Sequence, residues 1–415
     1  MRIVTILLWL GLIAPSTMFA VDYSHKKEVR QFVEQMHKKY NYKTNYLNKL
    51  FRNVRKNPIA PHKKSKPKIV KPLSEEYRPQ GKWDIYARMH LGHNQSLLGA
   101  EFMFEHQELF QEAYKEYGVP PEYIAAIIGI ESYYGKNRGI YYVFDSLTHL
   151  AFDGNRRSKF YKYQLQEFLR LCFREQLEPR AIKGSKSGAI GMAQFMPSNY
   201  KKFAVDFNHD GKVRLSKPAD AIGSIANYFK KNGWQKDEPV GTRVSYEGNR
   251  FNSFKTGFNH KYHRKNLKNI QPREYFAYEK KIMLIKLERE KYDELWYGAK
   301  NFYVITRYNH SDYYAMAVHQ LAQQIKSQFL AKYESPKEEK VYLAKKETVT
   351  TSPKTQEKYT PIHGVHTPLL SDIAPSLLKS PYHGLPRWSY HTCLHTLQLE
   401  LPPYCQVYCK PNSLL

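Results

Sequence analysis

The sequence predicts a mainly α-helical protein, for two reasons. Apolar side chains recur at helical spacing in several long stretches, and Ile124, Ile127 and Ile128 are the clearest case. Gly118 and Gly233 follow two of these stretches at the position where helices commonly end. The expected helices cover residues 100–117, 120–135, 158–177 and 221–231, and residues 301–329 are expected to form a turn that leads into a final amphipathic helix. The pattern of residues 240–292 predicts no particular element.

The N-terminus has the features of a secretory signal peptide over residues 1–20. Arg2 precedes an apolar run from Ile3 to Ile13, and a cleavage site after Ala20 is plausible, although Met18 stands where a small residue is preferred. The run is too short to span a bilayer, and no cysteine follows it that a lipid could modify. We expect a mature protein in the periplasm, with no stable membrane span.

Composition divides the remaining chain into four parts. Residues 21–57 show a basic amphipathic pattern that predicts one helix or a pair of helices. Proline and lysine dominate residues 58–72, which predicts an extended linker. Residues 73–330 form the expected main folded domain, which contains all the motifs described below, and residues 331–415 form a basic, weakly ordered tail rich in Pro, Ser, Thr, Lys and His.

The formal net charge of +27 favours polyanionic partners through long-range attraction. No zinc finger, basic zipper or RNA-recognition pattern is present, so nucleic acid is not the expected partner. An acidic polymer outside the cytoplasm agrees better with the signal peptide.

The four cysteines fall into two groups. Cys172 lies in an apolar helical run and is expected to be a buried thiol. Cys393, Cys405 and Cys409 stand near the C-terminus with two histidines, which would suit a metal site. In an oxidising compartment, one disulfide and a spare thiol are the stronger expectation.

Glu131 is the main candidate for a catalytic residue. Glu131 follows Ile124 by seven residues, which places it on the same helix face as Ile124, Ile127 and Ile128. That face should be buried. A carboxyl held against isoleucines loses hydration, so its pKa rises and it can serve as a general acid near neutral pH. The alternative is a helix-end glutamate whose side chain extends to water past Gly135.

Two other stretches carry polar groups with the character of a binding site. Residues 183–200 contain three glycines, which allow close approach of a ligand or another backbone, and Gln194 lies there among apolar neighbours. A core amide is an equally good interpretation of Gln194. Arg156 and Arg157 stand on a turn, either solvated or placed to meet carboxylates and carbonyls of a substrate.

Residues 206–220 contain part of a calcium-binding pattern. Asp206, Asn208 and Asp210 match the first ligand positions of an EF-hand, but Lys217 at position twelve cannot bind a cation. A longer loop closing at Asp220 would restore the ligand set. That set would be Asp206, Asn208, Asp210, the Lys212 carbonyl and Asp220. The alternative is an Asx-rich turn without a metal.

Taken together, these motifs resemble the membrane-bound lytic murein transglycosylase B family. The resemblance runs from about Trp83 to Gln323 and rests on YGVPPEYIAAIIGIES, FDGNRRS, KGSKSGAIGMAQFMPSNY, AVDFNHDGKVRL, PADAIGSIANYFKKNGW and NFYVITRYNHSDYYAMAV. It implies a lysozyme-like helical fold with a cleft. It also implies cleavage of peptidoglycan strands between N-acetylmuramic acid (MurNAc) and N-acetylglucosamine (GlcNAc), with a 1,6-anhydro ring left on the muramic acid.

The resemblance assigns roles to particular residues. Glu131 falls on the family's single catalytic acid. The positions that look like the family's cleft and sugar contacts are Tyr86, Arg156, Arg157, Ser185, Gln194, Tyr228, Tyr308, Asn309 and Tyr314. The family's fifteen-residue calcium loop falls on residues 206–220, so a structural Ca²⁺ is implied, whereas catalysis requires no cofactor. Glycan strands are the implied partner, and other cell-wall enzymes are a second class.

The sequence also departs from the family's pattern. Ser132 and Tyr134 stand where threonine and tryptophan are common, and a tyrosine next to the site can still stack on a sugar. Met192 and Ala193 replace an aromatic–glycine pair, and Asp153 adds a carboxylate near the cleft. Two alternatives remain: a lysozyme-like hydrolase in which Asp153 or another carboxylate positions water, and a cell-wall-binding protein without catalytic activity.

Overall fold

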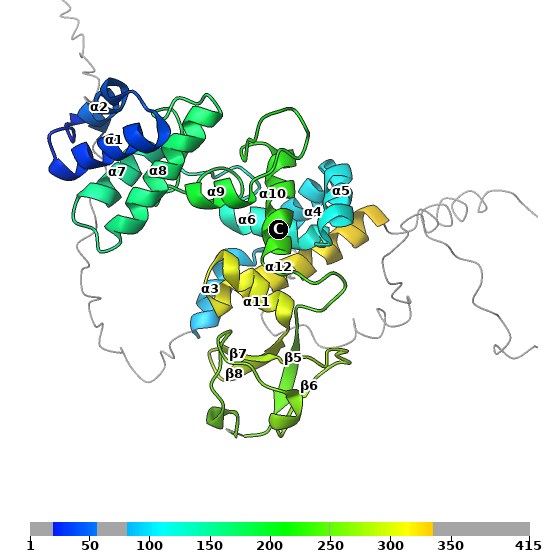
Figure 1. Cartoon of the computed structure of the whole chain (residues 1–415). Coiled ribbons are helices and arrows are strands. Elements are labelled where there is room, and N and C mark those ends of the chain that lie inside the picture. Colours follow the sequence, from blue (N-terminus) through cyan, green and yellow to red (C-terminus); the bar gives the residue numbers. More distant parts are fainter. Residues whose placement is uncertain (1–19, 56–80, 249, 335–415) are drawn as a thin grey trace, which may run out of the picture. The chain divides into compact units, whose positions relative to one another are not determined.

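The computed structural model describes residues 20–55, 81–248 and 250–334 (Figure 1). The predicted signal peptide (except Ala20), the linker at 58–72, the tail from residue 335 onward and the three C-terminal cysteines lie outside these residues. The described residues form twelve α-helices, which confirms the mainly helical class. The helices are α1 (Lys27–Tyr40), α2 (Thr44–Arg52), α3 (Lys82–His90), α4 (His93–Glu105), α5 (Gln107–Tyr117), α6 (Pro121–Ser132), α7 (Val143–Phe152), α8 (Ser158–Arg174), α9 (Pro197–Phe203), α10 (Pro218–Lys231), α11 (Lys300–Tyr308) and α12 (Asp312–Phe329).

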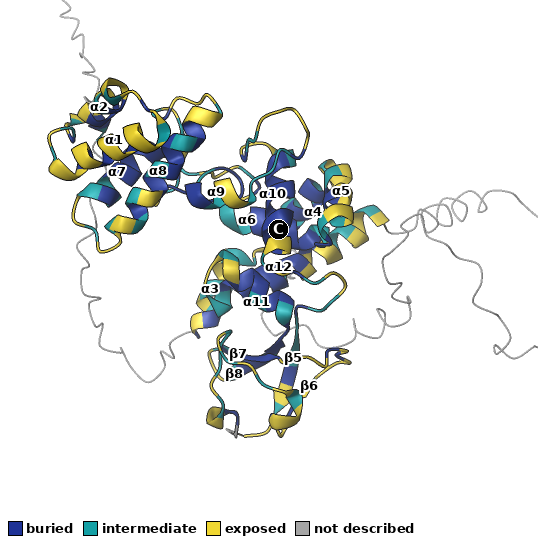
Figure 2. Ribbon diagram, viewed as in Figure 1, coloured by how far each residue is buried: buried dark blue, intermediate teal, exposed yellow. Residues whose placement is uncertain are grey.

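The largest core lies where α4, α6, α10 and α12 meet, and these helices are largely buried in Figure 2. The stretch predicted as one helix over 100–117 is interrupted at His106, which caps both α4 and α5. The Gly118 signal is confirmed, because Gly118 ends α5 in the left-handed conformation. Helices α3, α7 and α9 were not predicted, because with seven to ten residues each they are too short to show a clear helical period.

A second core joins the N-terminal segment to α7 and α8. Helices α1 and α2 are the predicted pair, and Val29, Phe32, Val33 and Met36 form their buried stripe. The strand β1 (Ala20–Val21) pairs with β2 (Val54–Arg55) and brings the two ends of this segment together. Cys172 is buried in this core as a free thiol, as predicted.

The stretch at 240–292, for which the sequence predicted no element, contributes most of a four-stranded antiparallel sheet. Its order is β6 (Ile270–Pro272), β5 (Gly241–Tyr246), β8 (Asp293–Gly298) and β7 (Met283–Glu288). The sheet encloses a third small core and lies beside α11 and α12 in Figure 1. Neither β7 nor β8 alternates strictly between buried and exposed side chains, and long irregular connections separate the other strands, so no strand pattern was evident. A minor pair, β3 (Tyr141–Tyr142) with β4 (Lys183–Gly184), completes the strands.

Candidate active site

Helix α6 presents Glu131 from the centre of the largest core. Pro120 caps the helix in an extended conformation, and Pro121 occupies its first turn, where the missing N–H has no cost. Ile124, Ile127 and Ile128 are fully buried, which confirms the predicted apolar face. Glu131 lies in the last turn of the same helix and is only partly exposed. The alternative of a solvated helix-end carboxylate is therefore wrong.

The chain turns sharply after α6, which decides the place of Tyr134. Tyr133 and Tyr134 both adopt left-handed backbone conformations. This turn directs the Tyr134 ring back into the core, where its hydroxyl donates a 2.7 Å hydrogen bond to the Gln95 carbonyl. The expectation that Tyr134 stacks on a sugar is wrong, because the ring fills space left by Gly99 and Gly129. Tyr133 is the exposed member of the pair, at 40%.

The carboxyl of Glu131 is held by one tyrosine. The Tyr314 hydroxyl donates a 2.6 Å hydrogen bond to Oε1 of Glu131. Loss of hydration raises the pKa of Glu131 to about 7, although the hydrogen bond from Tyr314 works in the opposite direction. Neither influence comes from a second carboxylate. A carboxyl of this kind is protonated in a useful fraction near neutral pH and can act as an acid and then as a base.

Tyrosine rings from separate elements gather around this carboxyl. Tyr314 on α12 stacks against Tyr308 with ring centroids 6.4 Å apart, and Tyr308 meets the edge of Tyr228 on α10 at 4.8 Å. Burial, and after it the charge of Glu131, raises the pKa values of Tyr308 and of Tyr86 on α3. The structure therefore brings these four predicted residues together with Glu131. Asn309 follows Tyr308 and is exposed.

Two aromatic residues that support Tyr86 were not predicted. Trp83 stacks on Tyr86 at 6.2 Å between centroids, and Tyr313 approaches the same ring at 5.9 Å. Trp83 is almost completely buried. The spacing of Trp83 and Tyr86, three residues apart, places them on one face of a helix and was the available signal.

The glycine-rich stretch brings Gln194 to the Tyr308 side of the site. The Tyr308 hydroxyl donates to the carbonyl of Ala193, the residue before Gln194. Gln194 has a positive φ of 45°, and its Nε2 donates to the carbonyls of Gly191 and Arg138. The amide is thus fixed in direction and only partly buried. Ser185 lies in the adjoining turn, and its hydroxyl accepts a 3.0 Å hydrogen bond from the Ala189 N–H.

Arg156 and Arg157 lie apart from this group. Both are exposed on the connection between α7 and α8, and the guanidinium of Arg157 covers the Phe160 ring at 4.3 Å. Within the described residues, neither is recorded in contact with Glu131 or its tyrosines.

Asp153 is bound to the N-terminal segment. One carboxylate oxygen accepts from Lys26 at 2.8 Å, and the other from the Tyr23 hydroxyl at 2.6 Å, with His149 at 3.0 Å. Burial alone would raise the pKa of Asp153, but these hydrogen bonds together hold it below its usual range. The contacts fasten the N-terminal segment to α7, which is a structural role.

The loop at 206–220 keeps its carboxylates close together but uses them internally. Asp206 accepts hydrogen bonds from the N–H groups of Asp210 and Gly211, and the Arg214 side chain bonds to Asp210 at 2.9 Å. Burial, followed by the charges of Asp206 and Asp210, raises the pKa of buried Asp220. No group of three or more His, Cys, Asp or Glu side chains in the described residues is arranged to hold a metal ion.

A carboxyl whose pKa is raised to about 7, beside several tyrosine rings, is suited to act as a general acid near neutral pH. Residues 24–323 match the model of the transglycosylase SLT domain family, and the chain belongs to that family. It is a lytic murein transglycosylase with a lysozyme-like fold. The match begins at residue 24 and so includes α1 and α2.

Individual relatives agree with this assignment. The chain is 33% identical to membrane-bound lytic murein transglycosylase B of Escherichia coli (strain K12) over 306 residues, which is 73% of this chain and 84% of that one. It resembles the E. coli lytic transglycosylase SLT35 solved in complex with calcium, with 33% sequence identity and a TM-score of 0.67. That match covers 75% of this chain and 97% of SLT35. SltB3 from Pseudomonas aeruginosa in complex with NAG-anhNAM-pentapeptide is more distant, with 27% sequence identity and a TM-score of 0.54. That match covers 60% of this chain and 69% of SltB3.

Proposed function

We propose that Glu131 alone supplies both the acid and the base of the transglycosylation. The observation that carries this proposal is the raised pKa of a partly buried carboxyl whose one described hydrogen-bond partner is the Tyr314 hydroxyl. Hydrolases that use two carboxylates need the second one at a defined separation. No second carboxylate among the described residues influences the pKa of Glu131.

The proposed reaction proceeds in two proton transfers. Protonated Glu131 donates its proton to the glycosidic oxygen as the bond from C1 of MurNAc to that oxygen breaks. The N-acetyl carbonyl oxygen of MurNAc stabilises C1 as an oxazolinium-like species. The Glu131 carboxylate then removes the proton from the C6 hydroxyl, and O6 bonds to C1 as the bond from C1 to the N-acetyl oxygen breaks, which forms the 1,6-anhydro ring and restores the N-acetyl group. Glu131 ends protonated, and no water is consumed.

The surrounding residues are proposed to hold the sugar in a reactive geometry. The Nε2 of Gln194 already donates hydrogen bonds to two backbone carbonyls. We therefore assign its Oε1 to accept a hydrogen bond from the substrate. Ser185 would donate its hydroxyl proton, since that oxygen accepts from Ala189. Tyr86, Tyr228, Tyr308 and Tyr314 would form the walls, with Asn309 as a polar contact. Orientation of this kind can supply several kcal/mol, on the order of 7–11 at its best.

Arg156 and Arg157 are proposed to meet carboxylates of the peptide stems at a distance from Glu131. Their exposure and their fork-shaped donor groups support this role. Peptidoglycan is thus the proposed partner through both its sugars and its peptides, and other cell-wall enzymes remain a further class of partner.

The deciding experiment is a digest of purified sacculi followed by mass spectrometry. Transglycosylation gives products with no added water, whereas a hydrolase would add one water to each. Glu131→Gln should abolish release while binding to sacculi persists. Release of water-added products by the wild type would establish the hydrolase alternative, and no release by the wild type would establish the binding-protein alternative.

The loop at 206–220 is proposed to bind a structural calcium ion. Its donor set of carboxylates, an amide and a backbone carbonyl matches the oxygen ligands that Ca²⁺ takes. Support comes from the mutual influence of three carboxylates and from the calcium complex of SLT35. The ion would be held by Asp206, Asn208, Asp210, the Lys212 carbonyl and Asp220. The ion pair between Arg214 and Asp210 would break when the ion binds.

We also propose that residues 1–20 direct export to the periplasm. The tail predicted for residues 331–415 is proposed to begin later than residue 331, because Tyr333 stacks on Phe104 of α4 at 4.1 Å between ring centroids. No helix in the described part of the chain is long and apolar enough to cross a membrane. Sequencing the N-terminus of the secreted protein should find Val21 as the first residue.

A further inference from the structure

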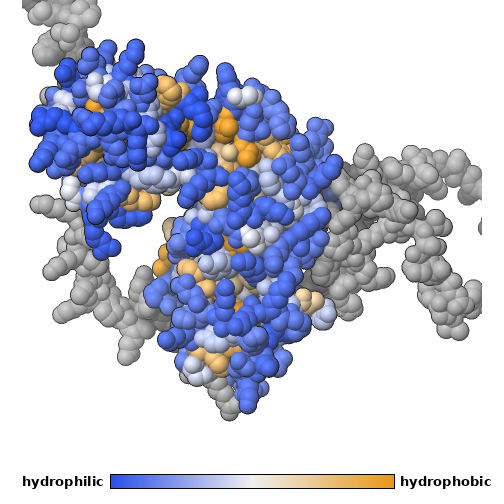
Figure 3. Space-filling model, in the orientation of Figure 1, coloured by the Kyte–Doolittle hydropathy of each residue, from blue (hydrophilic) through white to orange (hydrophobic). Residues whose placement is uncertain are grey.

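The segment between β5 and β7 concentrates positive charge away from the catalytic helix. Residues 250–281 include nine lysines and arginines but only two acidic residues. Figure 3 shows a surface that is mostly hydrophilic, with apolar side chains scattered in small groups. Nothing in the proposed reaction uses this segment, so its charge requires a separate account.

Two adjoining pockets lie on this segment. The first has a volume of about 400 Å³ and lies between the short 3₁₀ helix at Arg264–Asn266 and strand β6, with Tyr297 of β8 in its wall. The second, about 370 Å³, shares Arg264 and includes Tyr275, whose side chain is 95% exposed. Glu274 and Glu279 also line the second pocket, whereas the first has Arg264, Lys265 and Lys268 and no acidic residue in its lining. Only the first pocket therefore suits a small anionic group on an extended ligand.

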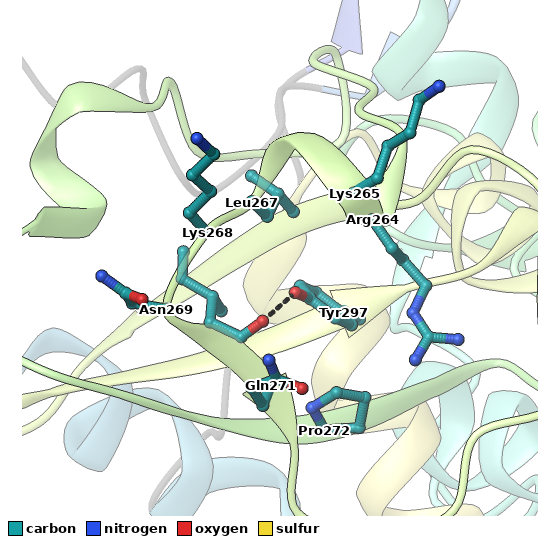
Figure 4. A pocket seen from close by; sticks show the side chains of 9 residues that line it. Arg264, Lys265, Leu267, Lys268, Asn269, Gln271, Pro272 and Tyr297 are labelled. Carbon is teal, nitrogen blue, oxygen red and sulfur yellow. Dashed lines mark hydrogen bonds between the residues drawn. The ribbon is translucent and has the colours of Figure 1, made fainter.

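The framework of the first pocket is fixed by hydrogen bonds. The Tyr297 hydroxyl donates 2.6 Å to the Ile270 carbonyl, which Figure 4 draws as the dashed line. Arg264 donates to the Phe276 carbonyl at 3.0 Å and lies 3.6 Å from Glu279. Arg264 therefore shapes the wall and is already engaged.

Lys265 and Lys268 are in a different situation. Both side chains are exposed, and within the described residues neither is recorded in a hydrogen bond or an ion pair. Figure 4 shows Lys268 and Asn269 on one side of the pocket and Arg264 and Lys265 on the other, with Tyr297 between them. Two cations at the edge of one pocket attract an anion more strongly than two separated surface lysines.

We infer that this pocket binds the carboxylates of peptide stems on peptidoglycan. The cations at its edge select an anion, and the side-chain amides of Asn269 and Gln271 in its lining suit the N–H and C=O groups of a peptide. A concave pocket with amides fits a peptide better than a flat layer of lipid phosphates. The inference depends on the lytic transglycosylase function and not on the role of Glu131.

The pocket is connected to the catalytic site by regular structure. Strand β8, which carries Tyr297, leads directly into α11, and α11 ends at Tyr308 in the tyrosine wall. The nine residues of α11 span about 13 Å at 1.5 Å per residue. A peptide stem bound in the pocket would hold the cell-wall polymer at a fixed position on the same domain that contains Glu131.

The test compares two double variants, each in a Glu131→Gln background. Lys265→Gln with Lys268→Gln removes the pocket's two free charges. Lys27→Gln with Lys39→Gln removes the same charge from exposed positions on α1 and is the matched control. Binding is measured by co-sedimentation with sacculi, with glycan strands stripped of stems by an amidase, and with phosphatidylglycerol vesicles. Melting curves establish that each variant is folded.

The pocket variant should bind intact sacculi about fivefold more weakly, as expected for two partly exposed charge contacts, and the control pair less than twofold. On stripped strands the two variants should bind equally. Equal losses for both pairs, a loss that persists on stripped strands, or lysine-dependent binding to vesicles alone would each overturn the inference. If the Glu131→Gln variant still cleaved sacculi, the role of Glu131 would be refuted, but the inference about the pocket would not. Binding to GlcNAc-MurNAc-pentapeptide, which has no bond that the enzyme cleaves, would then test the pocket.

Discussion

Tyr314 and Glu131 are 183 positions apart in the chain, and the Tyr314 hydroxyl donates a 2.6 Å hydrogen bond to the Glu131 carboxyl. The tyrosine is buried at 2% exposure, so the bond is shielded from water. It stabilises the charged form of Glu131 and partly offsets the effect of burial on the pKa. The bond therefore sets the pH range in which Glu131 can be either acid or base.

Tyr314→Phe should lower kcat and move the alkaline limb of the pH–rate profile to higher pH. Without the hydrogen bond the pKa of Glu131 rises further, so the protonated acid persists at higher pH. We expect kcat to fall about tenfold to a hundredfold, as for loss of a hydrogen bond to a charged group. Tyr303→Phe, the same change on the neighbouring helix α11, should leave the alkaline limb in place. An unchanged limb in Tyr314→Phe would contradict the assignment.

Glu131→Gln should change stability in a pH-dependent way. The folded-state pKa is raised to about 7, so the contribution of the protonated carboxyl is complete below the unfolded pKa and is lost as pH rises through 7. At pH 8 the variant should be more stable than the wild type by about 1–3 kcal/mol. Below pH 4 this advantage should disappear. Urea unfolding at pH 4, 6 and 8 measures it, and a difference independent of pH would argue against a dehydrated carboxyl.

Asp153→Asn should weaken attachment of the N-terminal segment without changing the product. The pKa of Asp153 is lowered in the folded state, so its contribution is present above the unfolded pKa and is lost as pH falls through the folded value. Because the side chain is partly exposed, the loss at pH 7 should be about 1 kcal/mol or less. Asp22→Asn, which removes a local contact to Ser24, is the control. If Asp153→Asn changed the product from hydrolysed to anhydro, Asp153 would be a catalytic residue.

Gly129→Ala should destabilise the catalytic helix. An added Cβ would lie 2.6 Å from the Tyr134 hydroxyl and 2.8 Å from its ring, so the ring must move. Overpacking costs about 1–3 kcal/mol, and the better helix propensity of alanine returns about 1 kcal/mol. Gly92→Ser, at the N-cap of α4 with no atom near its Cβ position, should be neutral or slightly stabilising. Thermal melting compares the two, and equal melting temperatures would show that Tyr134 is not fixed there.

Calcium should raise the melting temperature, and a chelator should reverse the increase. Binding to the folded state alone stabilises by about 2.7 kcal/mol when the ion is present at 100 times its Kd. Asp206→Asn should abolish the response, whereas Asp237→Asn, outside the loop, should retain it. Equal responses to calcium and magnesium, or none to either, would show that residues 206–220 form an Asx-rich turn.

The sequence predicted the catalytic helix well because its information is local. The spacing of Ile124, Ile127 and Ile128 fixes a buried face, and Glu131 interrupts that face wherever the helix packs. The interpretation of Tyr134, which came from the family resemblance, failed because the direction of this side chain depends on two left-handed residues and on the space beside two glycines. The sheet was missed because antiparallel pairing joins residues far apart, such as Arg243 and Trp296.

The sequence by itself determined the helical class, the candidate acid and the residues around it, since periodicity and motif spacing are properties of the chain. Only the tertiary structure decided which side chain contacts Glu131 and that Asp153 holds the N-terminal segment against α7. It also decided that Lys265 and Lys268 lie at the edge of a pocket. The physical reason is that dehydration and hydrogen bonding depend on neighbours brought together by packing. A carboxyl's pKa is set by those neighbours, whatever their distance along the chain.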